Sequence, residues 1–593
     1  MKVTVLDEIP EDPEIVLAWN NLVSRMARPE IFFTQQWALA ASRAFSHTLR
    51  PLTFLVYESG ELRGVAVMAV ARESPDSAFF LTASTADYCD ILSAPEARPA
   101  VFAALLDEMN KRSIRDLVFA NVPAESNTLQ AIAAAAPSRG FHIHDRPGYD
   151  CGIIALGDDE QRRSVLQSVL RKEHEKRGLK KLGRLGPVQV THLVAQFNAE
   201  KNAKELESAL EPIFAAQILR FLATNRVSPL TYSPRRHFLT ELARLMSSAG
   251  WLKISQLEVG GKPVAWNYGF RFFDSWFWYL PTFQMQYEES SPGSCLLRLL
   301  TEEACADPSV KRLDLGLGGE AYKERFSSAV SSTRYVKLSK SRTRHLLTVG
   351  RNKLAASAEK LPILDRQLRG GREVFHSIKT RMNQMGLAAI TTRTLTKVKR
   401  TVTSEDEIAF FEAPHIEISD GSAVLKALTW GDIAPAALHS ADDDQTLKYL
   451  GRCAQRMRDR SATGYFLPGQ QAQPAHFLWL RSYDGFVLSE IDSTLESNHA
   501  SAMRMMIFDC WTPAAQRGHG HYTTAIRLAA AEIQKQQKQA WIFSATSNKS
   551  SIRGIIKAGF VYRFSLVRSR KLFHTTMSRR EDTSSLHDWG TNK

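Results

Sequence analysis

Residues 254–268 read ISQLEVGGKPVAWNY, and residues 54–68 read FLVYESGELRGVAVM. Each stretch is an apolar strand, a glycine turn and a second strand that contains Val-Ala, which is the pattern of a β-hairpin. A looser third copy, FLWLRSYDGFVLS, spans residues 477–489 with Asp484-Gly485 as its turn. Similar segments at long intervals indicate repeated structural units. The sequence therefore predicts three copies of one α/β unit.

The residues after the second hairpin complete one such unit. An aromatic strand spans residues 275–280. Ser291, Pro292 and Gly293 then open a helix with leucines on one face, since serine is a good N-cap and proline fits the first helical position. A strand over residues 310–317 follows. Hairpin, strand, helix and strand in this order predict a mixed sheet with a crossover helix.

The stretch with the most specific chemistry is residues 503–522, MRMMIFDCWTPAAQRGHGHY. A strand runs into a loop and then into a helix whose apolar residues recur at helical spacing. Glycines at such a helix start let backbone N–H groups approach a pyrophosphate, and the helix dipole favours its negative charge. The candidate phosphate-binding residues are Gln516, Arg517, Gly518, His519, Gly520 and His521.

The positive charge of the chain is local. The 593 residues carry a formal charge of +14, a length typical of about three or four domains. Residues 161–190 and 341–400 hold most of the excess Lys and Arg, and the remaining sequence is slightly acidic. Neither segment interleaves aromatic residues regularly with its charges, as a single-strand stacking surface would. The distribution therefore argues against nucleic acid as a partner.

Composition also bears on metals and location. The 6 cysteines lie far apart, and His519 and His521 have no third ligand at useful spacing, so we expect no metal. No stretch approaches the roughly 18 apolar residues that span a bilayer, and the start of the chain is acidic, unlike a signal peptide. We expect a cytoplasmic protein. The basic segment 341–400 leaves peripheral membrane contact open, and the sequence leaves the oligomeric state open.

Residues 405–570 resemble the GNAT acyltransferases. The residues that match the family's phosphate motif and its C-terminal pattern are Arg517, Gly518, Gly520, Asn548 and 557–560. The resemblance implies that the strands ending near Cys510 and Ser544 part and admit the pantetheine arm of an acyl-CoA. It also implies an amine or hydroxyl acceptor that attacks the thioester, with Asn548 among the residues near the coenzyme.

Acyl transfer of this kind needs a base for the acceptor and an acid for the leaving thiolate. The candidate bases are Asp509, Glu490 and Asp492. The tyrosine that often serves as the acid in the family falls on Ile555 here. Either Tyr522 or Tyr562 then takes its place, or no side chain acts as the acid.

Most of residues 1–340 resemble the CelD-like acyltransferases, a family associated with polysaccharide biosynthesis, related to the Fem aminoacyl transferases and built from paired GNAT-like units. The matching residues, in order, are Trp19, Leu22, 32–33, 36–37, 64–66, 171–172, 180–181, 262–265, 291–293, 313–316 and 320–323. The resemblance implies that the second unit carries the chemistry of this half. Ser291, Pro292 and Gly293 would receive the donor's phosphates. The polar groups to test are Asp314, Tyr322 and Lys323.

We therefore predict tandem GNAT-like mixed sheets flanked by helices. The expected parts are a structural or substrate-shaping unit (1–155), a CelD-like acetyltransferase unit (156–340), a basic helical linker (341–404) and a C-terminal acyltransferase unit (405–593). The expected function is transfer from acetyl-CoA or another acyl-CoA to a sugar, nucleotide-sugar or other small-molecule or glycan acceptor, in polysaccharide or envelope synthesis. The alternatives are a Fem-type transfer from aminoacyl-tRNA and a noncatalytic scaffold.

Overall fold

The computed structural model describes residues 1–194, 203–359, 403–416, 423–469, 473–489, 491–495, 503–571 and 574–581. The chain divides into two compact units. Unit 1 holds residues 1–220 and 229–362, and unit 2 holds residues 221–228 and 363–593. The predicted linker begins as helix α11 (Arg342–Glu359), and its residues 360–402 lie outside the described part. The domain boundaries expected from the sequence stay a prediction.

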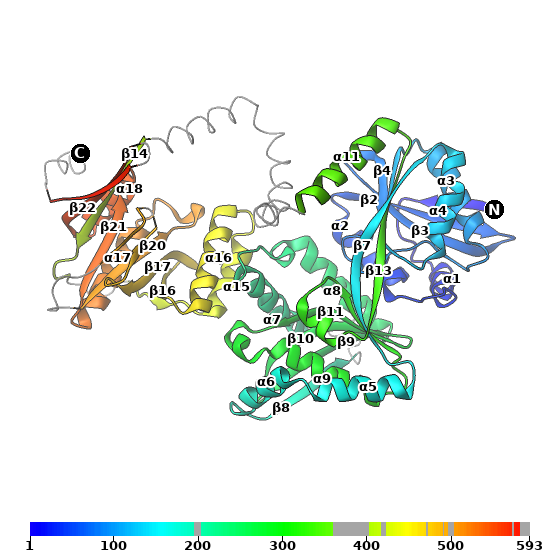
Figure 1. The fold of residues 1–593 in the computed structure, drawn as a ribbon, viewed down its shortest axis with the longest axis horizontal. Helices are drawn as coiled ribbons and strands as arrows, with labels where there is room; N and C mark the ends of the chain where they lie inside the picture. Colours follow the sequence, from blue (N-terminus) through cyan, green and yellow to red (C-terminus); the bar gives the residue numbers. More distant parts are fainter. Residues whose placement is uncertain are drawn as a thin grey trace. The chain divides into compact units, whose positions relative to one another are not determined.

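Unit 1 is built on one mixed sheet that contains both predicted N-terminal units. Its strands are β1 (Lys2–Leu6), β2 (Leu49–Glu58), β3 (Glu61–Ala71), β4 (Ser74–Phe80), β5 (Leu92–Ser93), β6 (Asp116–Pro123), β7 (His142–Ala155), β8 (Val188–Val194), β9 (Leu252–Val259), β10 (Lys262–Phe272), β11 (Ser275–Phe283), β12 (Arg312–Leu317) and β13 (Ala329–Ser339). They lie in the order β1-β2-β3-β4-β6-β13-β7-β12-β11-β10-β9-β8, and β5 pairs with β3. The long antiparallel strands β7 and β13 join the blue and green halves of the sheet in Figure 1.

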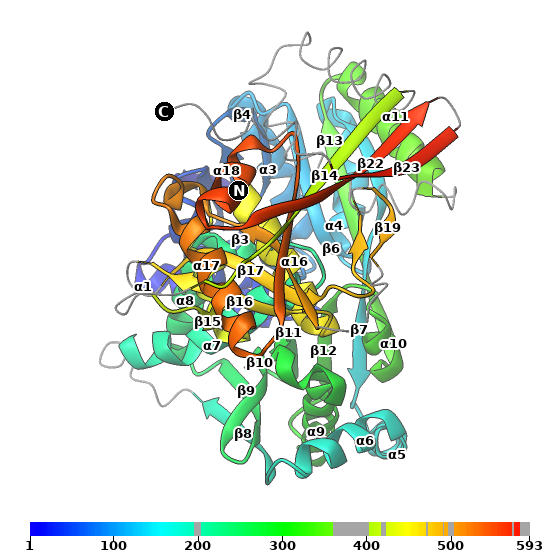
Figure 2. The same ribbon diagram turned by 90° about the vertical axis from the view of Figure 1, so that its left-hand side faces the viewer.

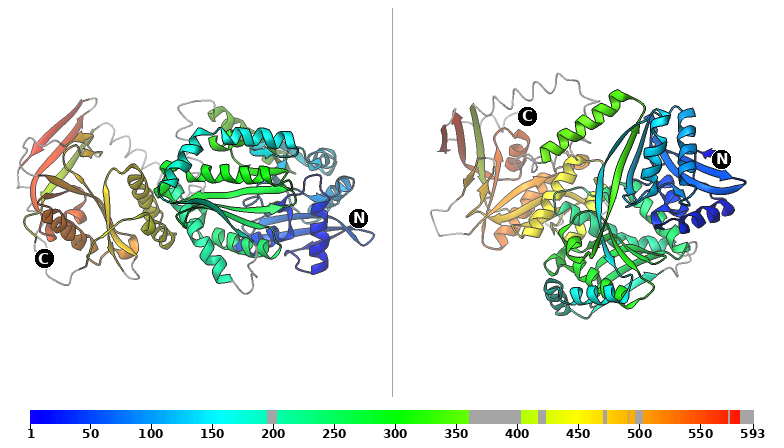
Figure 3. Two further views of the ribbon diagram at one scale, coloured as in Figure 1. Left: turned by 90° about the horizontal axis from the view of Figure 1, so that it is seen from below. Right: turned by 45° about the vertical axis from the view of Figure 1, so that its right-hand side comes forward.

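Helices cover both faces of the green strands of unit 1 (Figure 3, left). The helices of this unit are α1 (Pro13–Ser24), η1 (Ile31–Phe33), α2 (Gln35–Phe45), α3 (Arg98–Lys111), α4 (Asn127–Ala135), η2 (Pro137–Arg139), α5 (Asp159–Leu170), α6 (Glu173–Gly183), α7 (Ala203–Leu222), η3 (Pro229–Thr231), α8 (Ser233–Ser248), η4 (Met285–Ser290), α9 (Pro292–Ala306) and α10 (Ala321–Phe326). Helix α9 buries Leu296, Leu297 and Leu300 against β10 and β11. The predicted crossover from β11 through α9 to β12 is confirmed, and β11 and β12 are parallel.

Two of the three predicted hairpins are confirmed. β2 pairs with β3, and β9 pairs with β10, around turns at Gly60 and at Gly260-Gly261. These glycines have φ of 88°, 58° and 76°, a left-handed conformation that disfavours other residues. Glycine at these turns therefore fixes where each strand reverses.

Unit 2 contains a second mixed sheet. Its strands are β14 (Thr403–Glu412), β15 (Lys426–Ala427), β16 (Thr463–Pro468), β17 (Pro474–Ser482), β20 (Arg504–Trp511), β21 (Gln539–Ala545), β22 (Val561–Lys571) and β23 (His574–Arg580). The order is β15-β16-β17-β20-β21-β14-β22-β23, so the first strand of the unit lies between two of the last ones. Figure 2 shows β14, β22 and β23 side by side.

The helices of unit 2 lie on both faces of its sheet. They are α15 (Trp430–His439), α16 (Asp444–Asp459), η6 (Ala514–Gln516), α17 (His521–Lys535) and α18 (Lys549–Lys557). Ala525, Ile526 and Ala529 of α17 pack with Leu478 and Ile507 on one face. On the opposite face, Phe486 packs with Met506 and Trp541, and the Tyr449 ring of α16 lies beside the Phe477 ring. We call these the α17 face and the α16 face.

The third predicted hairpin is wrong. The residues after Gly485 form β18 (Val487–Leu488), which pairs with β19 (Ser493–Thr494) in a separate small sheet. β17 instead pairs with β16 and β20. Burial of Phe486 and Leu488 in the apolar cluster of the α16 face accounts for the difference, because it draws this segment away from β17.

The predicted fold class, mixed sheets flanked by helices in tandem, is confirmed by both units. Among the described residues, no helix combines the length and the apolar character that crossing a membrane requires.

Candidate functional site

A cavity in unit 2 lies where two parallel strands part. β20 and β21 are paired over residues 504–507 and 539–542, and the described residues show no pairing between them beyond Ile507. A cavity of about 1000 Å³ opens at this point. Four residues predicted from the sequence line it, namely Asp509, Arg517, Tyr522 and Asn548.

Side chains from both faces of the sheet line this cavity. Cys510 and Tyr522 pack against the apolar cluster of the α17 face. The guanidinium of Arg456, on α16, lies over the Phe508 ring at 5.1 Å on the opposite face. Because β20 and β21 are no longer hydrogen-bonded there, the cavity connects the two faces through the sheet.

The predicted phosphate turn leads into α17. Gly518 and Gly520 have φ of 87° and 74°, and a Cβ added at either would meet no atom within 4 Å. No side chain caps the N-terminus of α17 in the described structure. Arg517, a cavity residue, donates its Nε–H to the Thr512 carbonyl at 3.2 Å. This turn suits a phosphate, because it offers open space, an uncapped helix start and a nearby guanidinium.

Of the remaining turn residues, His519 is exposed, and Gln516 and His521 are half-buried. His519 and His521 have rings stacked 5.7 Å apart, and the His519 Nδ1 lies 3.4 Å from the carbonyl of Gln516. Partial burial and the neighbouring His519 lower the pKa of His521. Within the described ranges, no group of three or more His, Cys, Asp or Glu is placed to hold a metal ion.

Tyr522 lies at the cavity beside α18, the helix that carries Ile555. Its hydroxyl lies 2.9 Å from Ser551 Oγ on α18, and its ring lies against Gly554. Ile555 itself is fully buried in the core. Burial raises the pKa of Tyr522 far above its usual range. Tyr562, the other candidate, bonds Ser565 Oγ and is not a cavity residue.

Asn548 caps α18, whose start faces the cavity. Its side-chain oxygen accepts from the backbone N–H of Ser551 at 3.2 Å, and Ser550 Oγ donates to the same oxygen at 2.9 Å. The cap holds the first turn of α18 beside Tyr522. Asn548 therefore positions this edge of the cavity.

Asp509 is held by two arginines. It sits at a bulge of β20 with φ of 43°, uncommon for a residue with a side chain. Its carboxylate lies 2.5 Å from Arg456 Nη1 and 3.4 Å from Arg452 Nη2, both on α16. Two guanidinium groups occupy its oxygens, so we assign it to positioning rather than to proton transfer. Of the other candidate bases, Asp492 is exposed and outside the cavity lining, and Glu490 lies outside the described residues.

His476 is a cavity residue that the sequence did not single out. It lies within the apolar strand β17, is 1% exposed, and places Nδ1 at 2.7 Å from Thr512 Oγ1. Its Nε2 has no hydrogen-bond partner in the described part of the chain. Burial, with a smaller effect of His521, lowers its pKa to about 3, so the ring is neutral. A buried nitrogen without a partner is the kind of group that a ligand satisfies.

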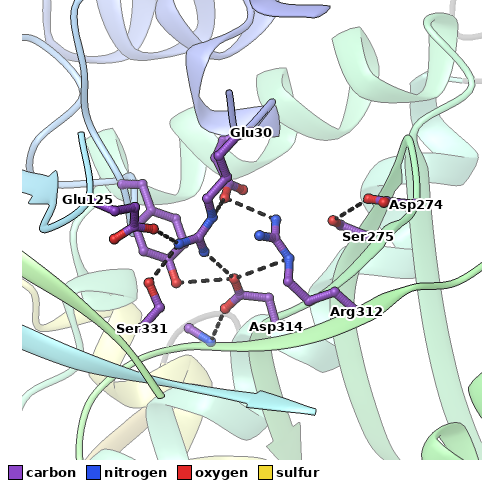
Figure 4. A network of polar contacts seen from close by, with 10 residues as sticks. Glu30, Glu125, Asp274, Ser275, Arg312, Asp314 and Ser331 are labelled. Atoms are coloured by element: carbon purple, nitrogen blue, oxygen red, sulfur yellow. Dashed lines mark hydrogen bonds and ion pairs between the residues drawn. The ribbon is translucent and has the colours of Figure 1, made fainter. Parts of the chain in front are cut away.

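In unit 1, Asp314 lies at the centre of a buried polar network (Figure 4). Its carboxylate is 1% exposed and accepts from Arg28 Nη2 at 3.3 Å, Tyr88 OH at 3.1 Å and the Gly316 N–H at 2.9 Å. Arg28 also donates to Ser331 Oγ at 2.6 Å. Asp314 thus ties the N-terminal segment to β12. We assign this residue a structural role rather than the catalytic one expected.

A second buried carboxylate completes the network. Glu30 is fully buried, and its Oε1 lies 2.5 Å from Arg28 Nε and 2.9 Å from Arg312 Nη2. Burial raises the pKa of Glu30. Two arginines and two carboxylates in one buried cluster balance in charge, which is the condition for keeping ions out of water.

The start of α9 differs from the expected cap. Ser291 has φ of 49° and makes no capping hydrogen bond; its Oγ lies 2.9 Å from His174 Nε2 instead. Helix α6 packs beside this turn, because a Cβ on Gly178 would lie 2.4 Å from the Ser290 carbonyl. Pro292 is buried, and Gly293 lies near the Phe283 ring. The turn predicted to take donor phosphates is therefore partly covered by α6.

Tyr322 and Lys323, the other residues expected in unit 1, follow β12. The Tyr322 hydroxyl accepts from Trp278 Nε1 at 3.3 Å, and burial raises its pKa to about 12. Lys323 Nζ donates to the Leu317 carbonyl at 2.6 Å and pairs with Glu320 at 3.0 Å. Both side chains hold the loop after β12 in place.

Asp87 gives unit 1 an expected pH dependence. Its carboxyl packs against Gly316, and burial together with Asp314 raises its pKa to about 7. A carboxyl whose pKa is higher in the folded state than in the unfolded state contributes stability at low pH. This contribution is complete below the unfolded-state pKa near 3.9, and it is lost as the pH rises through the folded-state pKa of about 7. Asp87→Asn should remove about 2 to 4 kcal/mol of pH dependence from the free energy of unfolding between pH 4 and 8. Urea unfolding of both proteins at several pH values measures this, and identical profiles would contradict the shift.

Residues 171–324 match the family described as the acetyltransferase (GNAT) domain. Over this segment the chain is similar to GNAT acetyltransferases. It contains α6, β9 to β12 and α9, with the parallel strands β11 and β12 on either side of the crossover helix. The enzyme class is therefore acyltransferase, as the resemblance to GNAT proteins implied. No curated protein matches the chain.

Among solved structures, the chain is similar to the C-terminal domain of a protein assigned as a lysylphosphatidylglycerol synthetase from Agrobacterium fabrum, with TM-score 0.37 and 12% identity over 58% of this chain and 96% of that one. It is similar to FemX, with TM-score 0.30 and 11% identity over 57% and 97%. It is also similar to a tandem GNAT protein from the clavulanic acid biosynthesis pathway, with TM-score 0.31 and 12% identity over 56% and 98%.

Proposed function

We propose that unit 2 binds an acyl-CoA, acetyl-CoA first of all, and transfers its acyl group to a small acceptor such as a sugar or nucleotide-sugar. The observation that carries this proposal is the cavity of about 1000 Å³ that connects both faces of the sheet where β20 and β21 part. A long thioester arm can lie along such a passage, with its phosphates at one end and its reactive carbon inside.

The residues at the α17 end of the passage suit the coenzyme. The turn at Gly518 and Gly520 leaves room for a pyrophosphate against the backbone of α17, and Arg517 adds a positive charge. The unpartnered Nε2 of His476 provides a polar contact for an amide of the arm. These features fit a donor that carries several phosphates on a narrow polar chain.

The bound thioester supplies an activated acyl carbon. We propose that Tyr522, whose hydroxyl lies at the cavity and stays protonated throughout the physiological range, gives a proton to the departing sulfur, and that the proton lost by the acceptor restores the hydroxyl. Ser551, bonded to that hydroxyl, holds it in position. The Asp509 carboxylate, fixed by Arg452 and Arg456, orients the acceptor end. For unit 1, we propose that residues 156–340, which include the matched segment 171–324, form a CelD-like acetyltransferase unit in polysaccharide or envelope synthesis, and that residues 1–155 shape its substrate site.

One observation favours a second candidate for unit 1. Helix α6 presents the exposed side chains Lys176, Lys180 and Lys181 and packs beside the Ser291 turn. A basic helix next to a donor-binding turn also suits a polyanionic donor such as an aminoacyl-tRNA.

Calorimetric titration of the 593-residue chain separates these functions. We expect acetyl-CoA to bind, and acetyl-pantetheine, which lacks the phosphates at the turn, to bind at least about tenfold more weakly. Tyr522→Phe is the matched variant. It should bind acetyl-CoA with unchanged affinity but should no longer release free CoA thiol when acceptors are screened for activity. Failure of acetyl-CoA to bind would overturn the proposal. Binding of tRNA that weakens steeply with salt would support the aminoacyl alternative.

A further inference from the structure

Three arginines line the cavity on the α16 face. Arg452 and Arg456 lie one turn apart on α16, and Arg481 lies near the end of β17 on the same face as Trp479. The guanidinium of Arg456 lies 5.3 Å from the Trp479 ring centre and 5.1 Å from that of Phe508. Stacking on aromatic rings holds this side chain at the wall of the cavity.

Among the described lining residues of this end, positive charges outnumber negative ones. Asp509 is the only acidic residue in the described lining of the cavity. It engages Arg456 at 2.5 Å and Arg452 at 3.4 Å, so one carboxylate faces two guanidinium groups. Arg481 is exposed and has no ion pair within the described residues, which adds a second uncompensated positive charge. The cavity wall on this face therefore attracts anions.

The donor's phosphates do not account for this charge. The turn at Gly518 and Gly520 leads into α17, which packs on the opposite face. Arg517 belongs to that end, because it bonds the Thr512 carbonyl just before the turn. A donor that enters from the α17 face and places its thioester at the parting strands leaves the α16 face to the acceptor. The excess positive charge lies where the acceptor must bind.

We propose that the acceptor carries an anionic group, a carboxylate or a phosphate, which Arg452 and Arg481 bind while Arg456 holds Asp509. This inference rests on the proposed function, since it assigns the acceptor class of the same site. A guanidinium donates two parallel hydrogen bonds to either group, so both chemistries fit the same arginines. The strained backbone at Asp509 turns its carboxylate toward α16 and keeps Arg456 from the anion.

The test uses the 593-residue chain saturated with CoA and matched probes. Glucosamine 6-phosphate and glucosamine differ by a phosphate, and serine and serinamide differ by a carboxylate. We expect at least one anionic member to bind about tenfold or more tightly than its neutral partner. Arg452→Gln and Arg481→Gln should each remove most of that preference. A preference within the glucosamine pair indicates a phosphate on the acceptor, and a preference within the serine pair indicates a carboxylate.

Arg458→Gln is the matched control, because it removes the same charge from the exposed side of the same helix outside the cavity lining. It should leave the preference intact. Equal binding of charged and neutral probes, or equal effects of all three substitutions, would overturn the inference. If acetyl-CoA binds the wild type and no anionic preference appears, only this inference fails. If Arg452→Gln and Arg481→Gln weaken acetyl-CoA binding instead, the arginines serve the donor and the inference fails as well.

Discussion

Gly520→Val should lower the affinity of the chain for acetyl-CoA by about a hundredfold or more. Gly520 has φ of 74° at the position before α17, and a branched side chain disfavours that conformation strongly. No atom lies within 4 Å of a Cβ built there, so the fold itself has room for the side chain. The methyl groups would instead fill the space through which a phosphate reaches the backbone N–H groups. Gly518→Val should act in the same way, since its φ is 87° in equally open space.

Gly559→Val provides the matched control for backbone strain. Gly559 follows α18 with φ of 93°, also has open space around its Cβ, and lies outside the turn that leads into α17. It should lower the stability of unit 2 to a similar extent without changing the affinity for acetyl-CoA. Calorimetry for binding and thermal unfolding for stability measure the two effects separately. An unchanged affinity in Gly520→Val, or an equal loss in Gly559→Val, would refute the assignment of the turn.

Asp314→Ala should destabilise unit 1 by about 3 to 5 kcal/mol. The substitution removes a carboxylate that is 1% exposed and leaves Arg28, the Tyr88 hydroxyl and the Gly316 N–H without their partner. The positive charge of Arg28 then keeps Glu30 as its only buried carboxylate partner, besides the exposed Glu125. Breaking a buried ion pair by removing one member costs more than the pair itself contributes.

Hydrogen exchange measures this loss within unit 1. We expect amide protection in β7, β12 and β13 to fall by about a hundredfold or more, while strands of unit 2 keep theirs. Glu125→Ala is the control, because Glu125 also pairs with Arg28, at 2.8 Å, but is 56% exposed. An exposed pair contributes only about 0 to 1 kcal/mol, so protection should hardly change. Full protection in Asp314→Ala, with loss of activity alone, would restore a catalytic role for this residue.

The local features of the chain were readable from its sequence. Hairpin turns at Gly60 and at Gly260-Gly261, the helix start at Pro292 and the glycine turn before α17 follow from backbone preferences of a few neighbouring residues. Alternating and helical apolar patterns then gave the fold class. The third hairpin failed because the α16 face buries Phe486 and Leu488 away from β17, which no local pattern reveals.

The roles of the charged residues were decided by tertiary structure. Asp314 meets Arg28 from 286 positions away, and Asp509 meets Arg456 from 53 positions away. Both carboxylates were candidates for chemistry from the sequence, yet distant arginines engage them. His476 resembled an ordinary strand residue, and only burial left its Nε2 unpartnered in the cavity wall. Backbone conformation could be predicted from the sequence because the preferences of a few neighbouring residues determine it. The partners of a charged side chain could not, because they depend on which distant segments the folded chain buries beside it.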